Sequence, residues 1–453
     1  MPLCSRPVTN QDRTPQAAST PNRAARRAAH RRAAAAVGSA ALLTTVSGAV
    51  GVLASGAPAG AAGYTVTTCD DSGPGSLRYA ITLADGNSTD DVITITATCT
   101  ASSPVDVSSA MTVNSGYALE IVGPGAADFV LDGGDNNVIL YFDNTSGDVT
   151  ISGVTFQHGS NTECGGAIEI AAAGDVTISS VVAVDNYTAV EGGGFCITNA
   201  GDVAVSNSTF ARNDANDGAA LYVVDSDRTT ITTSTFDSNV ATGDGGAVSI
   251  DRVGGLSVIA NSTFSGNVAG QNAGAIFFDY VYADVRLEFN TVVGNSAYYA
   301  GGLYMRSMAY NVDLVGNIFS GNTDHAGDDQ IVIGPDWAIS EYSNDFHGGG
   351  LSFVPDASDL DVDPQLGSLA DNGGPTQTMA LAVTSPLIDQ GPATWEAFPG
   401  EEYDQRGTPY VRVYGTAADI GAYEWQPGPD PGPGPDPTPG PTPEPTPEPS
   451  FTG

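Results

Sequence analysis

Seven copies of one phrase, between Gly147 and about residue 333, constrain this chain more than any other feature. An asparagine returns at spacings of 27, 26, 28, 28 and 27 residues, at Asn186, Asn213, Asn239, Asn267, Asn295 and Asn322, and Gly159 takes its place in the first copy. Three positions earlier stands an apolar column: Phe156, Ala183, Phe210, Phe236, Phe264, Val292 and Phe319. A fixed period of this length predicts stacked coils with the apolar column inside.

Each copy also contains a small pair, such as Gly245-Gly246, followed by a run that alternates apolar residues with others. Alternation predicts a strand with one buried face. Two inward columns without charges follow: Ile168, Phe195, Leu221, Val248, Ile276, Leu303 and Ile331, then Ile170, Ile197, Val223, Ile250, Phe278, Met305 and Ile333. A shorter alternating piece opens each copy, so one coil offers about three strands, and no copy has a helical period.

The length and composition of the repeat select among solenoids. Propeller blades need about 40 to 45 residues, and leucine-rich repeats have leucine at most of their core positions. Val, Ile, Phe and Thr fill the inward places here, which predicts an all-β, right-handed parallel β-helix, the handedness following the rule for parallel crossovers. The asparagine column then has a structural role, because asparagine tolerates a left-handed turn conformation and its amide can bond from coil to coil.

Charge excludes several partners. The 453 residues carry a formal charge of −37, and all 15 basic residues are arginine, seven of them before residue 33. Nucleic acid and anionic membrane surfaces are poor partners for such a chain, whereas cations and ligands without dominant negative charge suit it.

The first 61 residues predict export. A basic stretch, a weakly apolar Ala/Val/Leu stretch and small residues near Ala61 have the order of a signal peptide. We therefore expect a secreted or cell-surface protein, a monomer without a transmembrane segment after signal removal. Residues 426–453 are dense in proline, which predicts a disordered, extended stalk.

Cysteine usage agrees with an oxidising compartment, because an even number remains after Cys4 leaves with the signal peptide. Cys69 and Cys99 flank a helix-like segment and are expected to form a disulfide. The pairing of Cys164 with Cys196 stays open, since their separation of 32 residues is one coil plus five.

Residues 62–142 contain a strand, a short helix and an acidic turn, which resemble the N-terminal cap and first coils of secreted bacterial right-handed β-helix proteins. The repeats, in residues 143–337, resemble the polymorphic outer-membrane protein type, through Gly245 to Val248 and Phe264 to Asn267. Residues 338–425 resemble a choice-of-anchor type C-terminal domain that closes such solenoids. The matching elements there are Asp363-Pro364, Asp371 to Pro375, Ser385 to Asp389 and Asp419 to Gly421.

The resemblance permits catalysis, because β-helices include pectate lyases and polygalacturonases. Asp324, Asp328 and Asp329 echo part of a polygalacturonase signature, but they fall within one coil and are weak candidates. A lyase needs a base and Ca²⁺, and no arginine stands in a recognisable carboxylate motif, so we interpret the arginines as surface residues. Turns such as Asp132 to Asn137 and Asn213 to Gly218 have oxygen-rich chemistry, so calcium stays open as a ligand, and no other cofactor is expected.

An outward column between the two inward ones carries three rings, Tyr222, Phe277 and Tyr304. Such a stripe suits recognition of glycans or of surface proteins on host or neighbouring cells, and the alternative is that the rings stack on one another or lie beneath a loop. The sequence therefore favours a binding, adhesion or structural module. The competing function is an extracellular polysaccharide lyase or glycoside hydrolase with a pectin-type substrate.

Overall fold

The computed structural model describes residues 61–143, 145–306, 310–325, 329–334, 337–392 and 402–427. The expected signal peptide before residue 61, the stalk from residue 428 on and the candidate Asp328 lie outside these ranges. The described residues belong to one compact unit, Ala57–Gly453.

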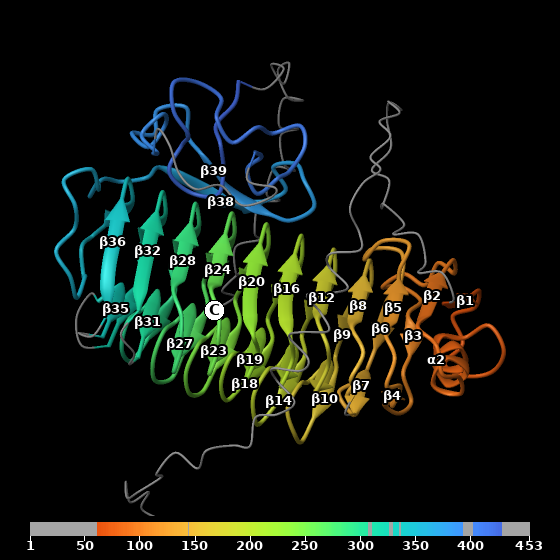
Figure 1. Cartoon of the computed structure of the whole chain (residues 1–453). Coiled ribbons are helices and arrows are strands. Elements are labelled where there is room, and N and C mark those ends of the chain that lie inside the picture. The colour runs from red at the N-terminus through yellow and green to blue at the C-terminus, as the bar shows by residue number, and fades with distance from the viewer. Residues whose placement is uncertain are drawn as a thin grey trace, which may run out of the picture. The chain divides into compact units, whose positions relative to one another are not determined.

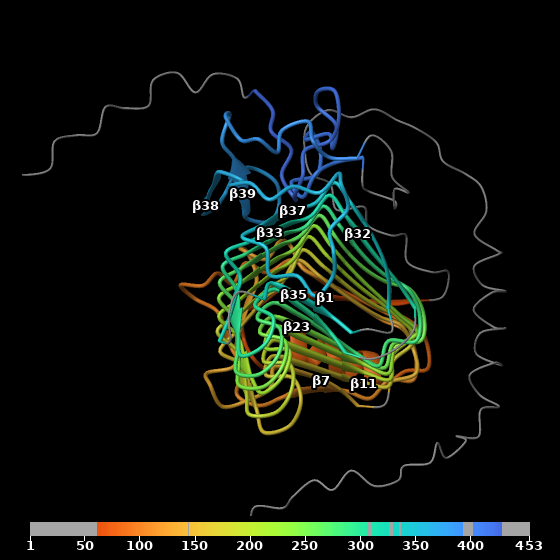
Figure 2. The ribbon, with the colours of Figure 1, turned by 90° about the vertical axis from the view of Figure 1, so that its left-hand side faces the viewer.

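The fold is a parallel β-helix, as expected from the repeat (Figure 1). Every strand pair among the solenoid strands is parallel, and each strand pairs with its counterpart one coil away. Val176, for example, pairs with Val149 on one side and Val203 on the other. A view along the coils shows successive strands superposed (Figure 2). The all-β prediction is confirmed.

Each complete coil contributes to four sheets, which we number in the order in which the chain meets them. Sheet 1 contains β1 (Ala62–Val66), β2 (Asp91–Ile95), β5 (Leu119–Val122), β8 (Val149–Ser152), β12 (Val176–Ser179), β16 (Asp202–Ser206), β20 (Arg228–Thr232), β24 (Ser257–Ala260), β28 (Val285–Glu288), β32 (Asn311–Val315) and β36 (Ala338–Tyr342). Sheet 2 contains β3 (Val105–Asp106), β6 (Val130–Asp132), β9 (Thr155–Gln157), β13 (Val182–Val184), β17 (Thr209–Ala211), β21 (Thr235–Asp237), β25 (Thr263–Ser265), β29 (Thr291–Val293), β33 (Ile318–Ser320) and β37 (Asp345–His347).

Sheet 3 is made of two-residue strands that the sequence did not predict: β10 (Ser160–Asn161), β14 (Tyr187–Thr188), β18 (Asp214–Ala215), β22 (Val240–Ala241), β26 (Val268–Ala269), β30 (Ser296–Ala297) and β34 (Thr323–Asp324). They are too short to show an alternation. Sheet 4 contains β4 (Met111–Val113), β7 (Leu140–Asp143), β11 (Ile168–Ala171), β15 (Phe195–Thr198), β19 (Leu221–Val224), β23 (Val248–Asp251), β27 (Ile276–Asp279), β31 (Leu303–Met305) and β35 (Ile331–Ile333).

The interior is built from stacked apolar side chains. Phe210, Phe236 and Phe264 are fully buried on successive coils. Their rings are nearly parallel, with centroids 5.1 Å apart for the first pair and 4.7 Å for the second. Offset stacking adds to the burial of these large side chains, so the aromatic column stabilises coil-to-coil contact.

The expected asparagine column is a hydrogen-bonded ladder at the corner between sheets 2 and 3. Asn213 Nδ2 donates to Asn239 Oδ1 at 3.0 Å and to the carbonyl of Ala183 at 3.0 Å, and the Asn213 backbone N–H donates to the same Asn239 oxygen at 3.0 Å. The ladder begins at the N–H of Gly159 and ends at Gln330 Oε1. Its members are buried, so their amides are satisfied without water.

One detail of the prediction is wrong. The left-handed conformation belongs to the residue before each asparagine, for example Asp185, Arg212 and Gly266, whose φ values are 56°, 53° and 63°. The preceding residue makes the sharp bend, and this bend directs the asparagine amide along the coil axis. Glycine takes the bend freely in the later copies, where Gly266, Gly294 and Gly321 stand.

A second ladder, absent from the sequence prediction, lies at the corner between sheets 1 and 2. Ser208, Ser234 and Ser262 accept backbone N–H groups in the earlier coils. Asn290, Asn317 and Asn344 take over in the later ones. The change of residue type hides the column from a search for one repeated letter.

The N-terminal end is covered by α2 (Leu77–Asp85). Ser76 caps it by accepting the N–H of Tyr79 at 3.2 Å, and Leu77, Ala80, Ile81 and Ala84 turn into the core. The disulfide Cys69–Cys99 holds this region, which confirms the predicted pairing. Coils begin at once, because β1 already pairs with β2.

Parallel pairing continues past residue 337, into β36 and β37. After them the chain forms the antiparallel hairpin of β38 (Leu366–Ala370) and β39 (Thr378–Leu381). Residues 363–392 and 402–427 dock beside the corner between sheets 1 and 2 (Figures 1 and 2). Thr263 Oγ1 donates to Gln405 at 2.6 Å, and the fully buried Arg412 donates to Asn261 at 2.6 Å. This segment thus contacts the side of the solenoid along several coils.

Candidate functional site

The outward side of sheet 4 carries the chemistry that the sequence pointed to. Tyr222, Ser249, Phe277 and Tyr304 stand in register on β19, β23, β27 and β31. Phe277 and Tyr304 stack with centroids 5.8 Å apart, whereas Ser249 separates Phe277 from Tyr222. The three expected rings therefore form a stacked pair and a separate tyrosine.

Turns fold back over the middle of this outward column. Gly218 and Gly245 have φ values of 55° and 64°, and a side-chain carbon placed on either would lie 3.0 or 3.1 Å from the Cβ of Ser249. Ser249 is 2% exposed and Phe277 4%, while Tyr222 and Tyr304 are partly exposed. Within this outward column, the exposed aromatic surface is therefore that of Tyr222 and Tyr304.

Two carboxylates stand side by side next to these rings. Asp251 ends β23 and Asp279 ends β27, and the two residues are register partners, so their backbones lie one strand spacing apart, about 4.8 Å. Each has one oxygen, Oδ1, that is buried with no hydrogen-bond partner among the described residues. We call Asp251 and Asp279 the acidic pair.

Burial raises the pKa of Asp251 to about 6, against the attraction of Arg252 and with added repulsion from Asp279. Burial likewise raises the pKa of Asp279, while Arg306 opposes the shift. Two carboxylates this close cannot both ionise freely in a desolvated place, so the pair holds protons at higher pH than ordinary carboxyls.

Arginines complete the arrangement. Arg306 Nη1 lies 3.1 Å from Asp279 Oδ2, its Nη2 lies 3.7 Å from Asp244 Oδ2, and its guanidinium carbon lies 5.3 Å from the centroid of the Phe277 ring. Arg252 binds Asp251 Oδ2 at 2.5 Å and both oxygens of Asp225 at 3.1 Å. The side chains of Arg252 and Arg306 are exposed, as expected of surface residues, but the expectation that they stand apart from any carboxylate cluster is wrong.

A row of further acids borders the face on the turn side. Asp217 Oδ1 accepts the N–H of Asp244 at 2.6 Å, and the backbones of Glu191 and Asp217 on neighbouring coils form an isolated parallel β-bridge. Burial raises the pKa of Asp217 and of Glu191, and repulsion between neighbouring acids adds to the shift in both. We call the outward side of β19 to β31 with its bordering residues the acidic–aromatic face: Asp217, Tyr222, Asp244, Asp251, Arg252, Phe277, Asp279, Tyr304 and Arg306.

Exposed tyrosines follow the same coils. Tyr280 directly follows Asp279 of the acidic pair, Tyr282 comes two residues later, and Tyr298 and Tyr299 precede β31. All four are more than 40% exposed. Tyr298 packs edge-on against Tyr299 at 4.6 Å and stacks on His325 at 5.4 Å. Aromatic surface is thus enriched on the coils of β27 and β31.

The weak catalytic candidates lie elsewhere. Asp324 ends β34 on sheet 3, and Asp329 is exposed in the segment before β35. Both stand outside the acidic–aromatic face, and Asp328 lies outside the described residues. The sequence signal that identifies the acidic pair is different: an aspartate directly after the second inward column in two successive copies, followed by arginine in the third.

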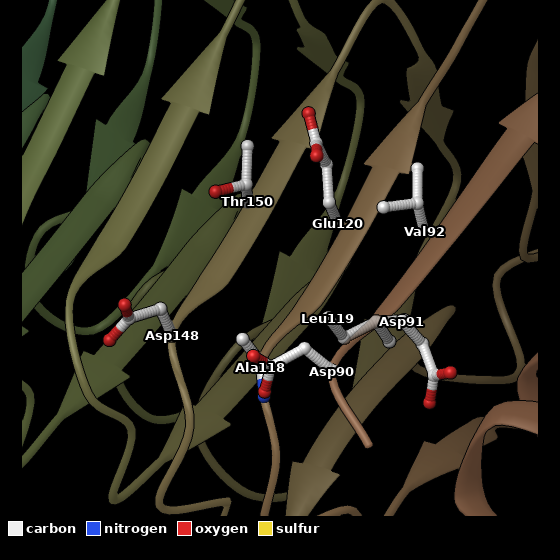
Figure 3. Close-up of a pocket in the computed structure, with 8 residues that line it drawn as sticks. All are labelled: Asp90, Asp91, Val92, Ala118, Leu119, Glu120, Asp148 and Thr150. Carbon is white, nitrogen blue, oxygen red and sulfur yellow. The ribbon is translucent and has the colours of Figure 1, made fainter. Parts of the chain in front are cut away.

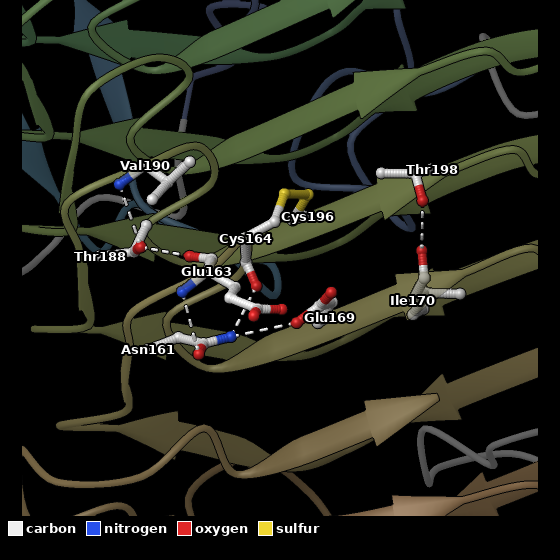
Figure 4. Close-up of a disulfide and its surroundings, with 9 residues drawn as sticks. All are labelled: Asn161, Glu163, Cys164, Glu169, Ile170, Thr188, Val190, Cys196 and Thr198. Carbon is white, nitrogen blue, oxygen red and sulfur yellow. Dashed lines mark hydrogen bonds between the residues drawn. A yellow bond between two sulfur atoms is a disulfide. The ribbon is translucent and has the colours of Figure 1, made fainter. Parts of the chain in front are cut away.

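The second disulfide, Cys164–Cys196, joins the turn before β11 to β15 of sheet 4 (Figure 4). Cys196 is in the outward column, and Gly165, with φ of 79°, turns the chain so that Cys164 lies over this column on the next coil. The fold-back of the turn supplies the five residues that simple stacking left unexplained. Asn161 steadies the turn by donating to the carbonyl of Cys164 at 2.8 Å and to Glu169 at 3.1 Å.

A shallow depression lies on sheet 1 near the N-terminal end (Figure 3). It is lined by Asp90, Asp91, Val92, Ala118, Leu119, Glu120, Asp148 and Thr150. Asp90 accepts the N–H of Ala118 at 3.1 Å and Asp148 that of Asp175 at 2.9 Å, so both link neighbouring coils. These carboxylates have a structural role in the stack.

Within the described ranges, no three His, Cys, Asp or Glu side chains are grouped so that they could hold a metal ion. Calcium binding at the acidic turns stays a prediction. No helix of the described residues is long and apolar enough to cross a bilayer.

Comparison with known families supports the fold. Residues 137–325 match the family model described as right handed beta helix region. No curated protein matches the chain. The matched stretch spans the acidic–aromatic face and the asparagine ladder. By fold, the protein is therefore a right-handed parallel β-helix protein.

Proposed function

We propose that this is an exported, surface-acting glycan-binding protein whose ligand lies on the acidic–aromatic face. The observation that carries the proposal is the juxtaposition of partly exposed rings, Tyr222 and Tyr304, with carboxylates and arginines on a run of adjacent coils. Flat rings pack against the apolar faces of sugar rings, and charged groups exchange hydrogen bonds with sugar hydroxyls. The regular coil spacing suits a ligand that is itself a repeating chain.

Binding to a panel of oligosaccharides tests this proposal, with the purified protein and a calorimetric or retention readout. Tyr304→Ala removes exposed aromatic surface from the face, so we expect affinity to fall at least about tenfold, roughly the 1–2 kcal/mol of one good aromatic contact. Tyr187→Ala is the matched control, because Tyr187 is 48% exposed on β14 of sheet 3, away from the face. Equal losses in both variants, or no retained glycan, would contradict the proposal. Retention of a cell-surface protein instead would assign the face to protein adhesion.

A second candidate, glycan cleavage, is favoured by the acidic pair. A glycoside hydrolase needs one carboxyl that is protonated and one that is ionised, and a pair of coupled aspartates with raised pKa supplies both forms near neutral pH. Asp251 would serve as acid and Asp279 as base or nucleophile.

Product analysis separates cleavage from binding. Glycans recovered from the binding experiment are scored for new reducing ends, which report hydrolysis, and for unsaturated ends, which report elimination. Asp251→Asn and Asp279→Asn should each abolish hydrolysis, whereas the control Tyr187→Ala should hydrolyse glycans as the native protein does. Intact glycans after long incubation with the native protein would remove this candidate.

Export and display complete the proposal. The two disulfides are compatible with an extracellular or surface location. The resemblance of the repeats to the polymorphic outer-membrane protein type, and of the C-terminal segment to a choice-of-anchor domain, supports display on a proline-rich stalk. Fractionation of cells that express the full chain tests this, with the expectation that the protein is recovered outside the cytoplasm.

A further inference from the structure

We propose that the ligand of the acidic–aromatic face is a glycan with free amino groups, one of whose ammonium groups binds at the acidic pair. This inference rests on the proposed glycan-binding function and narrows its ligand class. It concerns Asp251, Asp279, Asp244, Phe277 and Arg306.

The first argument is the balance of charge. The face gathers the carboxylates of Asp217, Asp244, Asp251 and Asp279 around two arginines. Arg252 is further shared with Asp225, which lies beside the face. Burial raises the pKa of Asp217, Asp251 and Asp279, so the negative charge of these groups is poorly compensated. A cationic ligand relieves this deficit, whereas a uronic-acid chain of the pectin type increases it.

The second argument is hydrogen bonding. Asp279 is 9% exposed, and its Oδ1, like that of Asp251, is buried without a hydrogen-bond partner among the residues that the structure describes. Both oxygens can accept hydrogen bonds for which the face supplies too few donors. An ammonium group brings three donors and no acceptor. A ligand carboxylate brings acceptors only, so it cannot satisfy these atoms.

The third argument is that the face already holds a cation in the required place. The half-exposed guanidinium of Arg306 lies over the Phe277 ring, between the carboxylates of Asp279 and Asp244. An organic cation is stabilised when an aromatic ring lies beneath it and two carboxylates lie beside it. Because the Arg306 side chain is long and 42% exposed, it can turn outward and leave this position to a ligand ammonium.

The test compares three oligosaccharides of equal length: a β-linked glucosamine oligomer, its N-acetylated counterpart and an oligogalacturonate. Binding is measured by calorimetry at a pH where the amine is charged, at low and at physiological salt. We expect the amine oligomer to bind at least about tenfold tighter than the N-acetylated one, with a preference that shrinks as salt screens the charges. The oligogalacturonate should bind weakest.

Variants locate the effect. Asp279→Asn and Asp251→Asn should each remove most of the preference for the amine while leaving the N-acetylated oligomer nearly unaffected. Asp106→Asn is the matched control, because Asp106 is exposed at the end of β3 on sheet 2, away from the face. Thermal melting verifies that each variant is folded, and Tyr304→Ala serves as the second variant, since it should weaken both oligomers equally.

The outcomes are separable. If the N-acetylated and amine oligomers bind equally, or if the oligogalacturonate binds best, the inference is overturned and the proposed function stands. If none of a broad glycan panel binds, the proposed function itself fails and the inference fails with it.

Discussion

Two columns of polar side chains run along the same coils, and they differ in how their polar atoms are paired. In the asparagine ladder, Asn239 Oδ1 accepts two hydrogen bonds from Asn213, and its Nδ2 donates to Asn267 and to the carbonyl of Phe210. In the acidic pair, Asp251 and Asp279 each engage one arginine, and each leaves a buried oxygen that has no hydrogen-bond partner in the described part of the chain. The ladder is self-sufficient, whereas the pair lacks donors.

This difference distinguishes a column with a structural role from one that is suited to binding a ligand. Asparagine carries both donor and acceptor, so a column of identical amides satisfies itself at one coil spacing without charge. Aspartate carries acceptors only, so neighbouring copies repel one another and need donors from elsewhere. A solenoid keeps such a column at a cost in stability, which is expected where the column has another use.

The largest expected effect is on the ladder. Asn239→Ala removes the acceptor of the Asn213 backbone N–H and side-chain amide, and it removes the amide that donates to the Phe210 carbonyl. Each orphaned buried group costs about 1–3 kcal/mol, so we expect the free energy of unfolding to fall by roughly 3–5 kcal/mol. Urea denaturation measures it. A loss below about 1 kcal/mol would show that water replaces the amide and that the ladder is dispensable.

The second ladder should respond less. Ser234 accepts only the N–H of Ser208, at 3.2 Å, and donates to the carbonyl of Thr232 at 2.7 Å. Ser234→Ala therefore orphans one buried donor, and we expect a loss of about 1–2 kcal/mol in the same denaturation experiment. Ser234→Asn tests whether the asparagine of the later coils can replace serine at this corner. Its free energy of unfolding should match that of the native protein only if the corner has room for the amide.

The acidic pair should show the opposite sign and a dependence on pH. The folded-state pKa of Asp251, about 6, lies above its ordinary value of 3.8, so the folded state holds the proton more tightly. The stability contributed by this group is present at low pH and is lost as pH rises through this window. Asp251→Asn keeps a neutral side chain, so we expect it to stabilise the protein above the window and to change little below it. Melting temperatures on both sides of the window measure this, with Asp106→Asn as the control. A variant that is less stable than the native protein at every pH would show that the Asp251 charge is needed for folding.

The smallest effect on stability should come from the exposed rim of the face. Tyr304 stacks on Phe277 but keeps part of its ring in water, so Tyr304→Ala should lower the unfolding free energy by about 1 kcal/mol or less while weakening glycan binding. Parallel melting and binding measurements test this separation. A large loss of stability would mean that the ring holds the sheet together and would weaken its assignment to the ligand.

Much of the fold could be predicted, because the repeat is visible in the amino-acid sequence. The spacing of Phe210, Phe236 and Phe264 required three stacked layers, and the structure places the rings face to face. The second ladder, which includes Ser208 and Asn290, was not predicted, because both serine and asparagine accept the backbone N–H groups at this corner and no single residue type recurs. Asp251 and Asp279 escaped it as well, because an aspartate at a strand end also suits an ordinary turn.

The sequence by itself determined the coil, its core columns and its asparagine corner, because each depends on residues that recur at one coil spacing. Only the tertiary structure decided which outward side chains remain accessible and which charges meet. Turns such as that of Gly245 fold over the sheet, and Arg306 reaches Asp244 on a coil two strands away. Exposure and ion pairing depend on side-chain directions and on segments packed from elsewhere, and a one-dimensional period carries no record of either.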